Sequence, residues 1–124
     1  MINMNDINHS VYQSMVKLRD LDANFLKYLG NGSHQWKDVG REEADGIMFL
    51  CPKCFKDNNG PVGTHSVICW FVGRVPDDVD PKPGRWNPSG TSIDDFSLVG
   101  PGAHSILMLG GCGWHGFVTN GDAS

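Results

Sequence analysis

The chain has 124 residues and a formal net charge of -4 at pH 7. This acidic balance disfavours a protein that binds nucleic acid or anionic membranes through general positive charge. No apolar run approaches the roughly 20 residues of a membrane span. The N-terminus also lacks the basic start and apolar run of a secretory signal, so we expect a cytoplasmic protein without a membrane partner.

The glycine and proline content indicates a fold with many turns. The chain contains 16 glycines and 7 prolines, whereas 40% hydrophobic and 19% charged residues are an ordinary globular balance. A chain of this length can bury one substantial core but not two independent ones. We therefore expect one domain, residues 1–124, built from short strands and turns rather than a helical bundle.

Residues 10–29 are predicted to form an amphipathic helix. Apolar side chains recur there at steps of three and four residues, with Ser10 as the N-cap and Gly30 as the stop. These side chains are Val11, Met15, Leu18, Phe25 and Leu29. The alternative is a break near residues 20–22, which would split the segment into a short strand and a shorter helix.

The remainder of the chain predicts short strands. A helical turn is expected at 41–44, and residues 73–102 are predicted to be a long irregular segment because they are rich in proline and glycine. β-Branched and aromatic residues mark the strands. They are predicted at 47–50, at 64–72, near 96–99, and on both sides of a hairpin spanning 104–119.

Two short motifs offer four metal ligands. Cys51-Pro52-Lys53-Cys54 and Cys112-Gly113-Trp114-His115 each place two donor side chains around a two-residue turn, or knuckle. Zinc prefers thiolate sulfur and imidazole nitrogen, with bonds of about 2.0–2.3 Å. We predict that Cys51, Cys54, Cys112 and His115 hold Zn²⁺. Because four protein ligands close the coordination shell, the ion would be structural.

These elements together predict an α+β fold. In it the N-terminal helix packs on a small antiparallel sheet, and a zinc-ribbon-like core contains the two knuckles. Trp114 is expected to shield the metal from water.

A rival ligand set combines Cys51 and Cys54 with His65 and Cys69. If 64–72 is a strand, His65 and Cys69 lie roughly 13 Å apart along it. Two ligands of one zinc ion need donor atoms only about 3–4 Å apart. We therefore expect Cys69 to be a buried thiol, and we keep His65, at the start of its strand, as a reserve fourth ligand.

Enzymatic alternatives are weaker. A thioredoxin-like thiol needs a helix after the first cysteine, and residues 57–61 are expected not to sustain one. The chain contains neither the His-x-Glu of zinc deaminases nor a zincin protease motif. A small metal-dependent hydrolase remains the alternative, with an open zinc site and His65, His104 or His115 as the base.

A nucleic-acid-binding ribbon would require one basic face. The residues that would have to form it are Lys53, Lys56, Arg74, Lys82 and Arg85.

Four strings occur in one order along the chain: GIMFLCPKCF, GPVGTHSVICWF, PKPGRWNPSGTSIDDFSL and GGCGWHGFVTNGD. They resemble a family of small uncharacterised zinc-binding proteins encoded by tailed bacteriophages and prophages, over nearly the whole chain from Leu18. The resemblance implies a phage or prophage origin and a zinc site at Cys51, Cys54, Cys112 and His115. It implies no activity.

From these observations we expect a non-enzymatic protein that acts by protein–protein interaction. The partner would be a phage virion subunit or a host protein, in the host cytoplasm or the virion. A homo-oligomer is compatible with the same observations.

Overall fold

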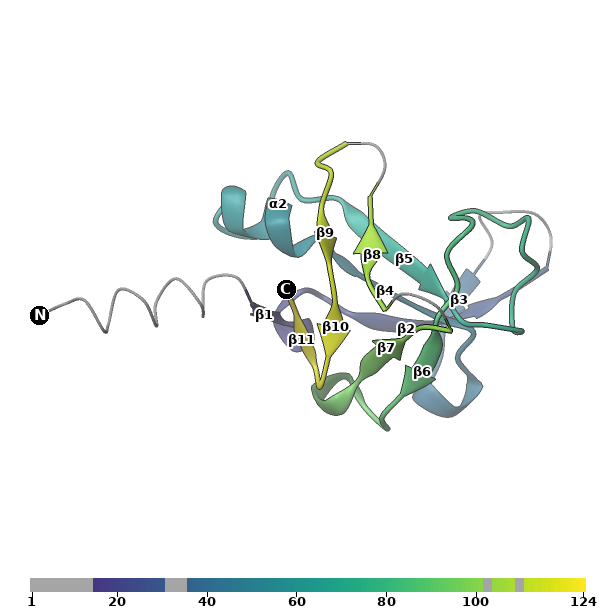
Figure 1. The fold of residues 1–124 in the computed structure, drawn as a ribbon. Helices are drawn as coiled ribbons and strands as arrows, with labels where there is room; N and C mark the ends of the chain where they lie inside the picture. The colour runs from purple at the N-terminus through teal and green to yellow at the C-terminus, as the bar shows by residue number, and fades with distance from the viewer. Residues whose placement is uncertain (1–14, 31–35, 102–103, 109–110) are drawn as a thin grey trace, which may run out of the picture.

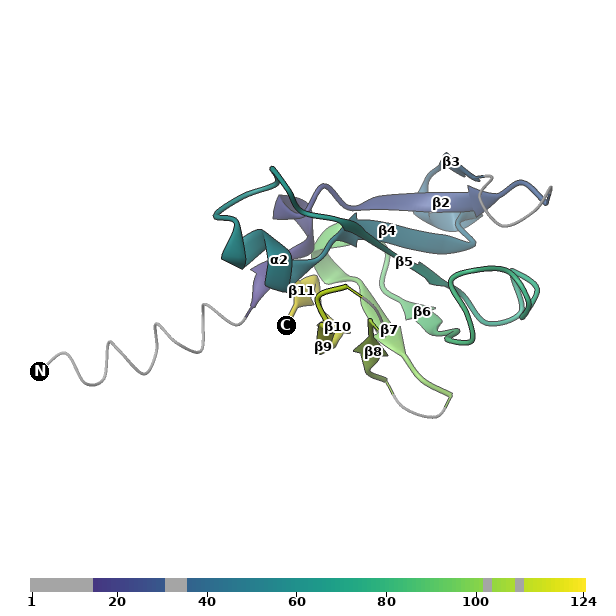
Figure 2. The same ribbon diagram turned by 90° about the horizontal axis from the view of Figure 1, so that it is seen from above.

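The computed structural model describes residues 15–30, 36–101, 104–108 and 111–124, which form two layers of short strands (Figure 1, Figure 2). The first layer is a four-stranded antiparallel sheet in the order β3-β2-β4-β5. Its strands are β2 (Asn24–Tyr28), β3 (Trp36–Asp38), β4 (Gly46–Leu50) and β5 (Ser66–Trp70).

The second layer is made of smaller antiparallel units, which Figure 2 shows beneath the four-stranded sheet. β6 (Asn87–Ser89) pairs with β7 (Ser97–Val99), and β8 (Ile106–Leu107) pairs with β9 (His115–Gly116). The last unit has the order β1-β11-β10, from β1 (Val16–Lys17), β10 (Val118–Thr119) and β11 (Asp122–Ala123).

Helices are short and few among the described residues. They are the α-helix α2 (Pro52–Asp57) and the 3-10 helices η1 (Leu18–Asp20), η2 (Arg41–Glu43) and η3 (Ile93–Asp95). None of them has the length and apolar character needed to cross a membrane. The fold is therefore mostly small antiparallel sheets, which agrees with the α+β prediction only in part.

The predicted helix at residues 10–29 is wrong where the structure describes it, and residues 10–14 lie outside the described part. The segment contains β1, η1 and β2 instead. Asp22, with a φ of 51°, separates η1 from β2. The adjacent residues Phe25 and Leu26 are both buried, in different clusters. Successive side chains of a strand point to opposite faces, so a strand can bury both. The helical spacing of the apolar residues thus came from three separate elements. The alternative break near 20–22 is present, but a strand follows it instead of the expected shorter helix.

Most of the other predicted strands are confirmed. β4 covers the strand predicted at 47–50, β5 lies within 64–72, β7 lies near 96–99, and η2 provides the turn at 41–44. The segment 104–119 does contain a hairpin, but the partner of β8 is β9 at residues 115–116, and residues 118–119 pair with β11 instead. The predicted irregular segment 73–102 also contains the β6–β7 pair and η3.

Both faces of the four-stranded sheet are covered. Ile47 and Phe49 on β4 and Val67 and Cys69 on β5 belong to the main core, which lies between the layers. The second layer contributes fully or nearly fully buried residues to this core, namely Phe96, Leu98, Ile106, Trp114 and Val118. The alternate residues of the sheet pack in a second cluster, which contains Leu26, Trp70, Val75 and Val79. This two-sided burial explains why β4 reads as a continuous apolar run.

The proline-rich segment after β5 is held by side chains that bind backbone carbonyls. Trp70 donates its indole N–H to the carbonyl of Asp80 at 2.8 Å. The guanidinium of Arg85 donates to five carbonyl groups, those of Val75, Pro76, Val79, Pro81 and Gly84. These bonds replace a regular ladder in this part of the chain.

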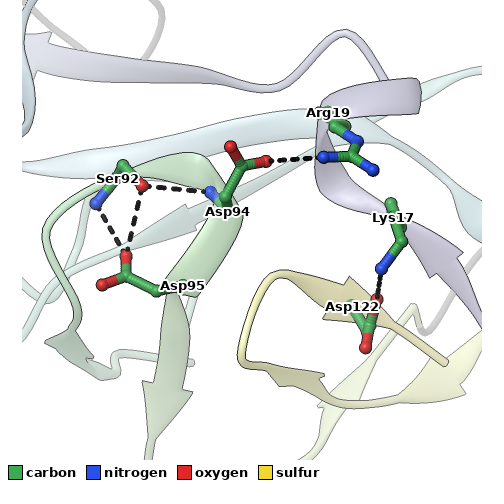
Figure 3. A network of polar contacts seen from close by, with 6 residues as sticks. All are labelled: Lys17, Arg19, Ser92, Asp94, Asp95 and Asp122. Atoms are coloured by element: carbon green, nitrogen blue, oxygen red, sulfur yellow. Dashed lines mark hydrogen bonds and ion pairs between the residues drawn. The ribbon is translucent and has the colours of Figure 1, made fainter.

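Side-chain contacts also connect η1 with η3 and β1 with β11 (Figure 3). Arg19 lies 3.6 Å from Asp94, and Lys17 lies 3.4 Å from Asp122. η3 begins with a capping box formed by Ser92 and Asp95. Hydrogen bonds from Ser92 and Thr91, above all from the backbone N–H of Ser92, lower the pKa of the exposed Asp95 carboxyl.

Candidate metal centre

The end of the β4–β5 ladder places Cys51 opposite His65. Leu50 pairs with Ser66 in the ladder. One step further, the backbone N–H of Cys51 donates to the carbonyl of His65 at 2.9 Å. Directly opposed residues in an antiparallel pair have Cβ atoms about 4.5–5.5 Å apart and project to the same face. The sheet itself therefore brings these two donor side chains together.

Helix α2 adds Cys54 to the pair. Cys51 is the N-cap of this helix, Pro52 occupies the first turn, and the backbone N–H of Phe55 donates to the carbonyl of Cys51 at 2.9 Å. Proline suits this position because its fixed φ matches the helix and no N–H is lost. Residues three apart on a helix lie on one face, so Cys54 stays beside Cys51.

This helix corrects an expectation from the sequence. The segment after Cys51, the first cysteine of the motif, does form a helix of six residues, which ends before Asn59, whose φ is 56°. Asparagine tolerates the left-handed conformation that commonly ends a helix.

The turn between β8 and β9 supplies Cys112. Gly111 and Gly113 on its two sides have φ values of 60° and 68°, a region that glycine adopts readily. The hairpin continues past β8, because the backbone N–H of Met108 donates to the carbonyl of Trp114 at 2.8 Å. Trp114 is 5% exposed and packs edge-on against Phe49 with ring centroids 6.0 Å apart. Trp114 thus anchors the turn to the core.

The four donor atoms of Cys51, Cys54, His65 and Cys112 all lie within 4.8 Å of one another. The Sγ atoms of Cys51 and Cys112 are 3.5 Å apart, and the Nε2 of His65 lies 3.3 Å from the Sγ of Cys112. Ligands of a tetrahedral zinc ion with bonds of about 2.0–2.3 Å have similar separations. Cys51 is buried and the other three residues are half-buried. This group could therefore hold a metal ion.

The second ring nitrogen of His65 is also engaged. Its Nδ1 lies 3.2 Å from the carbonyl oxygen of Ser66. A carbonyl oxygen only accepts, so this hydrogen bond places a proton on Nδ1. In the neutral ring, Nε2 then has a free lone pair that faces the Sγ of Cys112 and can bind a metal ion. With a second proton on Nε2, the ring instead donates to that sulfur. Histidine ligands in metalloproteins use such a hydrogen bond to a carbonyl group to fix ring orientation and tautomer.

The thiols of the group differ in acidity. Burial raises the pKa of Cys51 to about 12, and burial together with the thiol of Cys112 raises the pKa of Cys54. Burial acts in the same direction on Cys112, but hydrogen bonds from His65, from the backbone N–H of Trp114 and from the other two thiols lower its pKa to about 6. These hydrogen bonds thus favour the negatively charged thiolate of Cys112. A bound cation would neutralise that charge.

Three of the four residues predicted as ligands lie together, and His65 completes the described group in place of His115. His115 is exposed on β9, where it pairs with the exposed Leu107. The rival set does not assemble, because Cys69 is fully buried in the main core and outside the group. The buried thiol predicted for Cys69 is confirmed.

Three of the five cations needed for a basic face have local partners. Arg74 lies 3.0 Å from the buried carboxylate of Asp45, Lys53 lies 3.2 Å from Asp57, and Arg85 binds backbone carbonyls. Nothing in this arrangement favours a nucleic-acid interface.

No protein-family model, no curated protein and no solved structure matches this chain.

Proposed function

We propose that this protein is a small zinc-stabilised, non-enzymatic protein that acts by contact with another protein. The observation that carries the proposal is the group of Cys51, Cys54, His65 and Cys112, with its donor atoms within 4.8 Å of one another. Three thiolates and one imidazole are a common structural zinc set, and soft thiolate ligands disfavour magnesium and calcium.

A structural role is favoured over a catalytic one. Four protein ligands fill a tetrahedral shell, whereas a hydrolytic zinc site keeps one position for water. Zinc would join the end of β4, the start of α2, the start of β5 and the turn after β8. The ion would therefore connect the two layers. The phage or prophage origin and the choice between a virion subunit and a host protein remain predictions of the resemblance.

The zinc content of matched variants tests the metal site. The full chain, purified from zinc-supplemented cells, should contain one zinc ion per chain by inductively coupled plasma mass spectrometry. We expect His65→Ala and Cys112→Ser to lose most of that zinc. His115→Ala and Cys69→Ser should retain it, because neither residue belongs to the group.

Two results would contradict the proposal. One is a wild-type chain that folds without zinc and does not bind it on titration. The other is zinc loss in His115→Ala with normal zinc in His65→Ala, which would restore the ligand set predicted from the sequence.

A further inference from the structure

β5 is the outer strand of the four-stranded sheet, and part of its outer edge is free. His65 and Phe71 are bonded to β4 through the pairs with Cys51 and Asp45. In an antiparallel ladder, bonded pairs alternate with non-bonded ones, so the backbone groups of Ser66 and Ile68 point away from β4. Within the part of the chain that the structure describes, the N–H of Ser66 and the N–H and carbonyl of Ile68 have no hydrogen-bond partner.

The outer edge of β5 is already used at its other end. The backbone N–H of Trp86 donates to the carbonyl of Trp70 at 3.1 Å, and Val72 donates to the carbonyl of Trp86 at 2.9 Å. Phe71 and Trp86 form a parallel bridge there. The outer edge of β5 is thus competent to pair with a further segment, and residues 66–68 continue that edge.

A groove of about 430 Å³ lies along this free stretch, between β5 and β8. Residues 66–68 line one side of the groove and residues 105–108 line the other, and we call these two sides its banks. The turn at 81–84 lines a third side. Figure 1 shows β8 on the side of β9 that is nearer to β5, and Figure 2 shows β8 and β9 in the layer beneath β5. Because Met108 is bonded to Trp114 across the hairpin, the intervening Leu107 has its backbone groups directed away from β9. Both banks therefore offer strand edges.

The lining of the groove specifies what fits between these edges. Ile68, Trp86, Leu107 and Met108 present apolar surface, and Lys82 carries the only formal charge among the lining residues. Strand edges recognise an extended backbone, and apolar walls recognise alternate side chains. We propose that this groove binds an extended segment of a partner protein, with alternating apolar residues and one carboxylate opposite Lys82, as an added strand. This rests on the proposed function, since it names the surface through which the protein would act.

The proposed zinc ion would hold the two banks of this groove together. His65 directly precedes Ser66 on one bank, and Cys112 lies in the turn that follows β8 on the other. Removal of the metal should therefore weaken peptide binding even at temperatures where β2, β4 and β5 stay folded.

A random heptapeptide library, probed with the zinc-loaded full chain, tests the groove. Enriched peptides should alternate apolar and polar residues, contain Asp or Glu, and lack central proline. The best peptide is then resynthesised with N-methyl groups on alternate amides, which removes hydrogen-bond donors and keeps every side chain. We expect one of the two N-methyl registers to bind at least about fivefold more weakly, the effect of one or two lost hydrogen bonds.

Two variants block the edge in different ways. Ser66→Pro removes an outward N–H at an exposed position, where an edge strand tolerates proline. Leu107→Asp places a negative charge on the opposite bank, where the native side chain is 52% exposed, and this charge repels the carboxylate of the peptide. Both variants should bind the peptide at least about fivefold more weakly while zinc content and melting temperature stay close to wild type. The matched control is Val62→Asp, at a residue that is 86% exposed and outside the groove.

The outcomes separate this proposal from the metal site. Failure to enrich any peptide, equal binding in both N-methyl registers, or equal binding by Ser66→Pro overturns the groove proposal, although normal zinc content leaves the metal site intact. Dimerisation of the wild-type chain that Ser66→Pro abolishes would also overturn it, because a second copy would then occupy the edge.

Discussion

The two layers of the molecule are built in different ways. The four-stranded sheet has three strands of five residues, with a continuous ladder from Gly46–Trp70 to Leu50–Ser66 and apolar side chains on both faces. The second layer consists of strands of two or three residues. Such short strands are weak units by themselves, since even an isolated hairpin is marginal in water.

The second layer therefore depends on connections to the first. Two kinds are present: buried aromatic rings such as Phe96, which contacts Phe25 on β2, and the proposed metal group that includes Cys112. Gly116 adds close backbone packing within the second layer, against Ser124. We therefore expect stability to be unevenly distributed, and loss of a connection between the layers to cost more than loss of a contact within the second layer.

Loss of the metal group should have the largest effect. Structural zinc contributes on the order of 10 kcal/mol in small metal-dependent domains. Cys112→Ser should therefore lower the melting temperature sharply, and hydrogen exchange should rise first in residues 111–119, before β2 and β4. Cys69→Ser keeps all four proposed ligands and should keep this protection pattern. Equal exchange in both layers of Cys112→Ser would show that the second layer does not depend on the metal.

Phe96→Ala should have the next largest effect on the free energy of unfolding. The Phe96 ring is fully buried, its centroid is 5.2 Å from that of Phe25, and the Arg41 guanidinium lies 5.5 Å from it. Removal of a buried phenylalanine costs about 3–5 kcal/mol, which urea denaturation would measure. Phe117→Ala is the control, because that side chain is 47% exposed and its removal should change the free energy of unfolding by less than about 0.5 kcal/mol. A similar cost for both variants would contradict the role of Phe96 between the layers.

Gly116→Ala should have an intermediate effect. A Cβ atom at this position would overlap the carbonyl oxygen of Ser124, so the backbone of β9 or of Ser124 must move. Overpacking of this kind typically costs about 1–3 kcal/mol. Gly40→Ala, where a Cβ atom meets nothing within 4 Å, should leave the free energy of unfolding nearly unchanged. Equal stability of the two variants would mean that the C-terminal strand is not packed against Gly116.

Substitution of Asp95 should have the smallest effect on stability, and this effect should appear in how the melting temperature depends on pH. Hydrogen bonds from Ser92, which Figure 3 shows, and from Thr91 lower the pKa of Asp95 in the folded chain. A carboxyl of this kind contributes stability above its unfolded pKa of about 3.9, and the contribution disappears as the pH falls through the lower folded value. Asp95→Asn should therefore flatten the change in melting temperature below about pH 4 relative to wild type. An unchanged slope would mean that the capping box does not form in solution.

The sequence predicted half of the four-stranded sheet, β4 and β5, but neither β2 nor β3. β4 and β5 follow from apolar runs, which remain readable because both faces of the sheet are buried. β2 was missed because its apolar residues, together with those of β1 and η1, mimic helical spacing. β3 has only three residues, and an element of this length shows little periodicity.

The candidate site shows the same limit. The three cysteines could be identified because each lies in a local motif with a turn. The choice of His65 over His115 depends on the register of β4 and β5, which puts His65 opposite Cys51 across 13 intervening residues. The start of β5 was the available signal, and it marked His65 only as a reserve ligand. The β8–β9 pairing, which directs His115 to solvent, is a property of the folded hairpin.

X-ray absorption spectroscopy at the zinc edge of the purified full chain would identify the ligands of the ion. We expect one zinc ion with three sulfur ligands at about 2.3 Å and one nitrogen ligand at about 2.0–2.1 Å. The nitrogen contribution should disappear in His65→Ala and persist in His115→Ala. A shell with fewer than three sulfur atoms, or with an oxygen ligand from water, would contradict a closed site formed by Cys51, Cys54, His65 and Cys112.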